Sequence, residues 1–172
     1  MIRAAVAADA ARMAEINVFG WRCAYRGIIP DAFLFSKLLV HKRMQAFEKG
    51  FEARTGESYV YEADGIVKAF MSIGECRDGD KKDAFELWGV YVEPCLRGQG
   101  IGRKLMEFCE ERARSGGYPE IVLWVFKENR ASIGFYEKLG YTFDGKEEIM
   151  DSFNAVKVRF SKRLKRSDCE VE

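Results

Sequence analysis

The chain has 172 residues, of which 48% are hydrophobic and 13% aromatic, which suits one domain with a substantial core and excludes a second. Its 28 lysines and arginines and 27 aspartates and glutamates leave a net charge of +1, so no overall field would attract nucleic acid or an anionic membrane. Five scattered cysteines without a Cys-x-x-Cys pair, and a single histidine, argue against a zinc site or a disulfide framework.

The chain shows no long apolar segment after Met1 and no run approaching the length of a membrane span. We therefore expect a soluble protein of the cytoplasm, with no membrane anchor and no bound metal. Periodicity and turn signals then predict the elements in chain order. The first are a strand at 2–6, helical stretches beginning at Asp9 and running from Pro30 to Gly50, and hairpin strands at 58–63 and 66–76 around Asp64-Gly65.

The second half of the chain alternates strands and helices. We expect a strand at 84–92, a helix from Ile101 to Gly116, a strand at 121–126, a helix from Asn129 to Gly140, and strands at 141–147 and 153–160. The helix from Ile101 carries Leu105 and Cys109 on the same face and glutamates on the other, so it has one buried side.

A glycine-rich turn, Arg97-Gly98-Gln99-Gly100-Ile101-Gly102, stands between the strand at 84–92 and this helix. The first backbone N–H groups of a helix have no partner within the helix, and glycines let an anion approach them. The guanidinium of Arg97 adds a positive charge that can bind phosphate oxygens. The order of strand, turn and helix therefore predicts a phosphate site.

Two nucleotide-binding motifs do not fit this turn. A dinucleotide-binding turn needs G-x-G-x-x-G, but the sixth residue counted from Gly98 is Arg103, and the sequence contains no G-x-x-x-x-G-K-[ST]. A turn that only packs the helix against the strand, with no ligand, is the other interpretation of this segment.

A second motif follows the apolar strand at 121–126. In Asn129-Arg130-Ala131-Ser132-Ile133-Gly134-Phe135-Tyr136-Glu137-Lys138-Leu139-Gly140-Tyr141, the first residue suits an N-cap and Gly140 suits the end of a helix. Ala131, Phe135 and Leu139 recur every four residues and are expected to face the core. Tyr136 would lie beside this stripe, where its hydroxyl could reach a cleft.

Together, R-x-x-G-x-G after a strand and the later N-x-x-A-x-x-F-Y-E-K-L-G-Y resemble the two diagnostic segments of the GCN5-related N-acetyltransferase (GNAT) superfamily, which binds acetyl-coenzyme A. The resemblance is strong over residues 84–143 and looser elsewhere. It implies an α/β (α+β) fold, with a mixed, mostly antiparallel sheet of six to seven strands flanked by about four helices. It also implies acetyl-coenzyme A as the cosubstrate.

The resemblance further implies that the strand at 84–92 bulges and parts from the strand at 121–126, which frees backbone groups for the thioester and pantetheine. The turn would bind the pyrophosphate. The cofactor-binding residues expected are Val90, Tyr91, Val92, Arg97, Gly98, Gln99, Gly100, Ile101, Gly102, Arg103, Asn129, Ser132 and Tyr136.

Acetyl transfer to an amine needs a neutral amine and a proton or hydrogen bond for the departing thiolate. Tyr136 is the candidate for the second task; the alternative is a tyrosine at the edge of the core. Glu86 is the candidate base, because many relatives carry a catalytic glutamate at this point of the strand. The alternatives are a structural glutamate at a strand edge, with water or another residue as the base.

The acceptor is the least determined part of this prediction. Trp21, Tyr25 and Arg26 belong to a segment that resembles one bordering the acceptor site in many small relatives, although core aromatics with solvated arginines would look the same. We expect an amine-bearing acceptor and neither nucleic acid nor membrane as a partner, and a homodimer is left open.

The sequence as a whole predicts an acetyl-coenzyme A-dependent N-acetyltransferase that acts on a primary amine of a small molecule or peptide by direct transfer in a ternary complex. Residues 1–161 would form its single domain and 162–172 a charged C-terminal tail. The alternative is a non-catalytic acyl-coenzyme A-binding or regulatory module of the same fold, because a fold and a cofactor motif do not define the second substrate.

Overall fold

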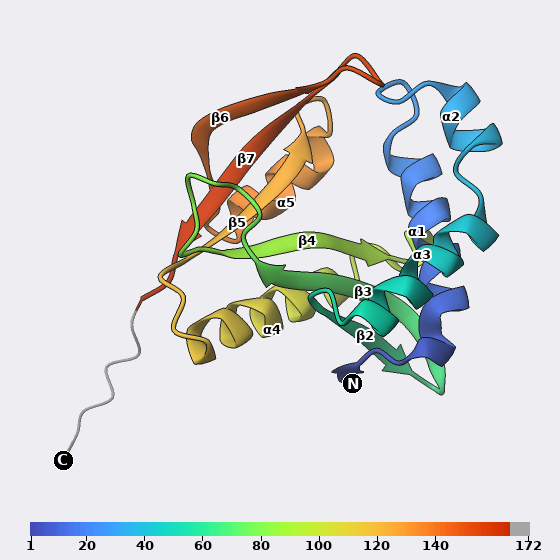
Figure 1. The fold of residues 1–172 in the computed structure, drawn as a ribbon, viewed down its shortest axis with the longest axis horizontal. Helices are drawn as coiled ribbons and strands as arrows, with labels where there is room; N and C mark the ends of the chain where they lie inside the picture. Colours follow the sequence, from blue (N-terminus) through green and yellow to red (C-terminus); the bar gives the residue numbers. More distant parts are fainter. Residues whose placement is uncertain (166–172) are drawn as a thin grey trace.

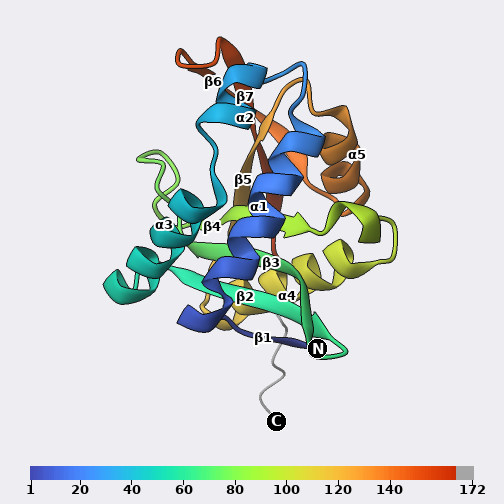
Figure 2. The same cartoon turned by 90° about the vertical axis from the view of Figure 1, so that its right-hand side faces the viewer.

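Residues 1–165, which the computed structural model describes, form a seven-stranded sheet with helices on both faces (Figures 1 and 2). The strands are β1 (Ile2–Ala4), β2 (Glu57–Ala63), β3 (Ile66–Glu75), β4 (Phe85–Val92), β5 (Glu120–Phe126), β6 (Thr142–Met150) and β7 (Ala155–Arg163). The α-helices are α1 (Ala10–Ala24), α2 (Asp31–Ser36), α3 (Val40–Ala53), α4 (Ile101–Ser115) and α5 (Arg130–Lys138). Short 3-10 helices occupy Ala7–Asp9 and Pro94–Leu96.

The strand order is β1-β2-β3-β4-β5-β7-β6, and every neighbouring pair is antiparallel except β4 and β5. Helix α4 connects that parallel pair, as a parallel pair requires a crossover. The predicted mixed, mostly antiparallel sheet is therefore confirmed. Among the described residues no helix is long and apolar enough to span a bilayer.

The helices form two layers. Figure 2 shows α4 and α5 on one side of the sheet and α1 and α3 on the other. Helix α4 buries Leu105, Met106 and Cys109 in the main core, together with Leu87 of β4 and Leu123 of β5. Leu105 and Cys109 were predicted on the buried side of this helix, whereas Met106 was not. Glu110, which was expected on the polar side, is 7% exposed and pairs with Arg114 and Lys162.

Strands β4 and β5 pair over only part of their length. Phe85, Glu86 and Leu87 lie opposite Ile121, Val122 and Leu123, and beyond that point β4 follows β3 while β5 follows β7. The register of β3 against β4 also shifts next to Trp88, as expected of a β-bulge. The parting of the two strands that the resemblance implied is thus present.

The segment from Pro30 to Gly50 was expected as one helical stretch but forms two helices. The N–H groups of Lys37 and Leu38 both donate to the carbonyl of Phe33, which ends α2. The guanidinium of Arg22 donates hydrogen bonds to the carbonyl oxygens of Leu34 and Leu38 at 3.0 and 3.2 Å. These contacts satisfy carbonyls that a continuous helix would have used and stabilise the break.

The two ends of the described chain also differ in detail from the prediction. The side chain of Asp9 caps the turn before α1 rather than α1 itself, because it accepts the N–H of Val6 at 2.9 Å and pairs with Arg3. Strand β7 runs to Arg163, and the N–H of Leu164 donates to the carbonyl of Pro119. The rest of the expected charged tail, residues 166–172, lies outside the described residues.

Candidate active site

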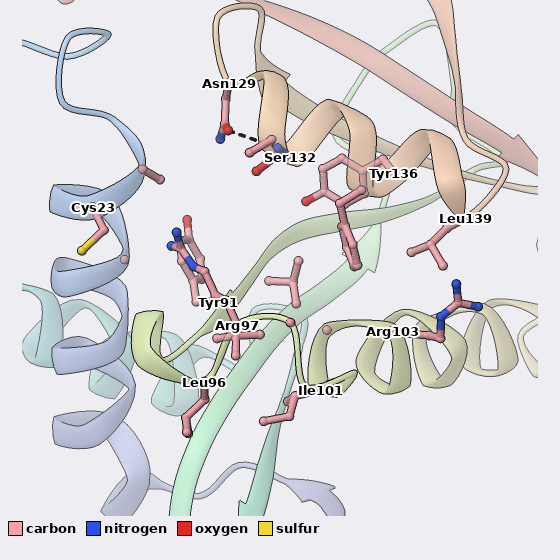
Figure 3. A pocket seen from close by; sticks show the side chains of 18 of the residues that line it. Cys23, Tyr91, Leu96, Arg97, Ile101, Arg103, Asn129, Ser132, Tyr136 and Leu139 are labelled. Carbon is pink, nitrogen blue, oxygen red and sulfur yellow. Dashed lines mark hydrogen bonds between the residues drawn. The ribbon is translucent and has the colours of Figure 1, made fainter.

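A cavity of about 610 Å³ opens where β4 and β5 part, between the N-terminal end of α4, helix α5 and the end of α1 (Figure 3). Its lining residues come from four segments of the chain. They are Gly20, Cys23, Ala24 and Tyr25; Val90, Tyr91 and Val92; Leu96, Arg97, Gly98, Gly100, Ile101, Gly102 and Arg103; and Asn129, Ala131, Ser132, Phe135, Tyr136, Lys138 and Leu139.

The residues expected to bind the cofactor converge on this cavity. Val90 to Val92, the turn from Arg97 to Arg103, and Asn129, Ser132 and Tyr136 all line it, with the exception of Gln99. Gln99 lies between two lining glycines, and it is exposed. Segments that are far apart in the sequence therefore meet at one place, which the sequence alone predicted only through the resemblance.

The turn before α4 leaves backbone donors free. Gly98 and Gly100 have φ angles of 81° and 80°, which side chains with a Cβ rarely adopt. The first N–H of α4 that finds a carbonyl within residues 1–165 is that of Lys104, which donates to Gly100 at 3.1 Å. The N–H groups of the first turn of α4 thus remain available to an anion, and Arg97 lies at the same cavity.

The third glycine of the turn serves packing. A Cβ added to Gly102 would come within 3.2 Å of the Phe135 ring, so a glycine here lets α4 and α5 approach closely. Helix α5 itself begins as predicted, because the Asn129 side chain accepts the N–H of Ser132 at 3.2 Å.

The prediction for the core-facing side of α5 was right in part. Ile133 and Tyr136 are the buried residues, whereas Ala131 is exposed and Phe135 and Leu139 are half-buried. Ala131, Phe135 and Leu139 line the cavity, and Phe135 and Leu139 also pack against the main core. A helix beside a ligand cavity needs apolar residues on two sides, so the four-residue repeat marked the cavity wall.

Tyr136 is placed to act on a molecule in the cavity. Its side chain is 9% exposed, and in Figure 3 it extends from α5 into the space that faces Tyr91 and Arg97. Burial raises the pKa of this phenol above its ordinary value of 10.0. The hydroxyl therefore stays protonated, and donation of a hydrogen bond is favoured over complete proton transfer.

Glu86 lies in a different environment from the one expected of an accessible base. It is 2% exposed, and its carboxylate accepts the backbone N–H of Arg77 at 2.9 Å and the guanidinium of Arg77 at 3.1 and 2.5 Å. It does not line the cavity. The sequence located this residue on β4 but gave no signal for Arg77, which approaches it from the β3–β4 loop.

The residues expected at the acceptor site separate into two groups. Tyr25 lines the cavity, and the indole N–H of Trp21 donates to the hydroxyl of Tyr91 at 3.1 Å. Arg26 does not line the cavity; its exposed guanidinium lies 3.4 Å from Asp31. The two aromatic residues are therefore brought to the site, and the arginine is not.

Sequence reasoning missed several lining residues, among them Cys23 and Lys138. Lys138 and Leu139 follow Phe135 by about one helical turn, so their helical spacing could have identified them. Cys23 carries no such signal, because its place at the cavity depends on how α1 packs across the sheet.

Comparison with known proteins places these features in a family. The sequence profile of the acetyltransferase (GNAT) family matches residues 21–141. The L-amino acid N-acyltransferase MnaT of Escherichia coli is 35% identical over 94 residues, which cover 53% of this chain and 55% of that protein. An uncharacterised N-acetyltransferase of Methanocaldococcus jannaschii is 36% identical over 138 residues, or 78% of this chain and 58% of that protein.

The chain thus spans little more than half the length of these two relatives. Among solved structures, the PaiA N-acetyltransferase of Thermoplasma acidophilum in complex with coenzyme A has the same fold, with a TM-score of 0.70 and 20% identity over 95% of this chain and 98% of that one. The matched segment contains both the glycine-rich turn and the α5 motif, and the fold agrees. The chain therefore belongs to the acetyltransferase (GNAT) family.

Proposed function

We propose that the protein transfers an acetyl group from acetyl-coenzyme A to a primary amine of a small molecule or peptide, directly, in a ternary complex. The observation that carries this proposal is the cavity where β4 and β5 part, because it joins the free N-terminal end of α4 to the buried hydroxyl of Tyr136. A phosphate-binding turn and a protonated hydroxyl are what the pyrophosphate and the thioester of an acyl-coenzyme A require.

The residues present fit acetyl-coenzyme A. The turn from Arg97 to Gly102 would hold its pyrophosphate on backbone N–H groups. Backbone groups of Val90 and Val92, which β5 leaves unpaired, would hold the pantetheine amides and the thioester oxygen. The thioester supplies the acetyl group. The Thermoplasma relative, which was crystallised with coenzyme A, supports this assignment.

Two side chains would then assist the transfer, one at the departing sulfur and one at the amine. Tyr136 would donate a hydrogen bond to the departing sulfur, which lowers the energy of the thiolate as it forms. Glu86 would take the proton of the amine, through water, once Arg77 has moved away from its carboxylate. The name of the Escherichia coli relative supports an α-amine as acceptor, and a cytoplasmic location stays a prediction.

The first test compares two glycines at opposite ends of α4. Gly100 and Gly117 have φ angles of 80° and 77°, and a Cβ at either position would meet nothing within 4 Å. Alanine should therefore destabilise both variants similarly, by about 1 kcal/mol. Only Gly100 lines the cavity, so Gly100→Ala should weaken coenzyme A binding by about tenfold or more, measured by calorimetry.

Turnover separates an enzyme from a binding module. We expect free thiol to appear when the protein is incubated with acetyl-coenzyme A and a panel of primary amines, and not without an amine. Equal coenzyme A affinity in the two folded glycine variants would refute the cofactor site. Tight coenzyme A binding with no thiol release over a broad panel would favour the non-catalytic module.

A further inference from the structure

The side chain of Tyr91 belongs to the α1 side of the sheet. Successive residues of a strand point to opposite faces. Val90 and Val92 pack with the core under α4, whereas Tyr91 packs with Phe70, its ring stacked at 5.1 Å. The hydroxyl of Tyr91 is thus on the side of the sheet opposite α4, in the part of the cavity next to α1. This side of the cavity is the part left for the acceptor.

The surroundings of Tyr91 hold its ring in place and leave the proton of its hydroxyl without an acceptor. A Cβ at Gly89 would lie 2.9 Å from this ring and one at Gly20 would lie 3.4 Å from it, so small residues make room on both sides. The indole of Trp21 donates to the hydroxyl oxygen at 3.1 Å. Within residues 1–165 the hydroxyl finds no acceptor for its own proton, which can therefore be donated into the cavity.

Tyr25 provides a second hydroxyl of the same kind. Its ring packs edge-on against Trp21 at 4.9 Å and against Phe126 at 5.0 Å, so Tyr25 and Tyr91 contact the same indole. The described residues offer its hydroxyl no acceptor either. Burial, and then the nearby phenols of Tyr91 and Tyr136, raise the pKa of Tyr25, so this group also stays a neutral donor.

The charges around the cavity have one sign. Arg97, Arg103 and Lys138 line it, and no aspartate or glutamate from the described part of the chain does. Glu86, the candidate base, is buried and bound to Arg77. An acceptor with several amines would therefore find no counter-charge here. Two unused hydroxyl donors instead suit an acceptor that carries oxygen atoms.

We propose that the hydroxyls of Tyr25 and Tyr91 bind an oxygen of a carboxylate or carbonyl group attached to the carbon that carries the acceptor's amine, and that the apolar side chain of the acceptor packs on the apolar residues that line the cavity. The acceptor is then an α-amino acid or the N-terminus of a peptide with an apolar first residue. This proposal rests on the proposed function, because it assigns the second substrate of that reaction.

Three amines with the same apolar part test the proposal: L-leucine, L-leucinamide and 3-methylbutylamine, which lacks the oxygen. In Tyr91→Phe and Tyr25→Phe, kcat/KM for leucine and leucinamide should each fall about tenfold, and kcat/KM for 3-methylbutylamine should stay within about twofold of wild type. Each amine is compared with itself across enzymes, so differences in amine basicity cancel. Tyr118→Phe is the control, because Tyr118 packs against Phe85 away from the cavity.

Binding provides a readout that does not depend on turnover. With coenzyme A present, calorimetry should show that leucine or leucinamide binds the wild type more tightly than 3-methylbutylamine and loses about tenfold in Tyr91→Phe. This result without any acetyl transfer would refute the proposed function and support the acceptor site. Equal losses for all three amines, unchanged kinetics in both variants, or no preference for the oxygen-bearing amines would overturn the acceptor proposal.

Discussion

Tyr136 and Tyr141 are two buried tyrosines whose ring centres lie 6.2 Å apart, but of the two only Tyr136 lines the cavity. Tyr136→Phe should lower kcat about ten- to a thousandfold and leave coenzyme A affinity nearly unchanged, because it removes a donor needed only as the sulfur departs. Tyr141→Phe makes the same chemical change to a hydroxyl that has no partner among the described residues, so turnover should persist. Steady-state kinetics and calorimetry on both variants decide this.

The raised pKa of Tyr136 adds a pH criterion to that comparison. Because burial keeps the phenol protonated beyond its ordinary value of 10.0, wild-type turnover should not decline from tyrosine ionisation as the pH approaches 10. A decline near pH 10 that is absent from the residual activity of Tyr136→Phe would show that this hydroxyl titrates normally and is open to water.

Glu86 and Arg77 form a pair whose two members should respond differently to substitution. If Glu86 accepts the amine's proton, Glu86→Gln should lower the rate at neutral pH, and part of the loss should return as the pH rises toward the amine's own pKa. Arg77→Met removes the guanidinium that covers the carboxylate, so the neutral-pH rate should be retained or increased. Rates measured across pH for both variants test this.

A uniform loss at every pH, shared by both variants, would give the pair another role. Glu86 would then anchor the β3–β4 loop through Arg77 and would not exchange protons with the acceptor. A Glu86→Gln protein as active as wild type would mean that water serves as the base.

At the scale of single elements, local signals predicted the parts of the site that are local. Asn129 caps α5 through its own side chain, and the glycine-rich turn precedes α4. Both could be predicted because they depend only on neighbours within a few residues. The hairpin at Asp64-Gly65 has the positive φ angles that its sequence requires. Such features can be predicted from one sequence without an alignment.

Other features depended on contacts between distant elements. The break between α2 and α3 is stabilised by Arg22 of α1, and the burial of Glu86 depends on Arg77 in a loop. Phe135 repeats with Ala131 and Leu139 in the sequence as a core residue would, and it both packs against the core and lines the cavity. Periodicity indicates which side of a helix is apolar, and it does not say whether a neighbouring element or a ligand covers that side.

At the scale of the whole molecule, Arg159 of β7 connects the β3–β4 loop to β6. This residue of β7 is 3% exposed, and its guanidinium binds Asp78 and Asp80 of the β3–β4 loop at 2.8 and 2.9 Å and Asp144 of β6 at 2.7 Å. A buried arginine needs such carboxylates, because an unpaired charge in the interior is strongly destabilising.

This cluster makes the folding stability of the protein depend on pH in the acidic range. Hydrogen bonds from Arg159 and then Lys146 hold the pKa of Asp80 well below its ordinary value of 3.8. A lowered pKa in the folded state stabilises the protein above the unfolded value, and this contribution disappears as the pH falls through the folded one. Asp80→Asn should therefore lower Tm at neutral pH, and the difference from wild type should shrink below about pH 4.

Thermal unfolding followed from pH 7 to pH 2 checks this expectation. Asp151→Asn, in the turn between β6 and β7, is the control, because Asp151 is exposed and makes no ion pair with a described residue. A Tm difference for Asp80→Asn that is the same at every pH would indicate that shape or packing, and not the charge of Asp80, is responsible.

The incomplete pairing of β4 and β5 creates the cavity but leaves backbone hydrogen bonds unformed, so activity and stability make opposite demands on it. Past Leu87 and Leu123, each strand has a row of backbone groups that a continuous sheet would join by hydrogen bonds. A variant selected only for heat resistance could gain by closing this gap, and closing it would remove the cavity. We therefore expect stabilising substitutions that preserve function to lie elsewhere, in surface loops and at helix ends. Substitutions that stabilise the unpaired parts of β4 and β5 should lower turnover.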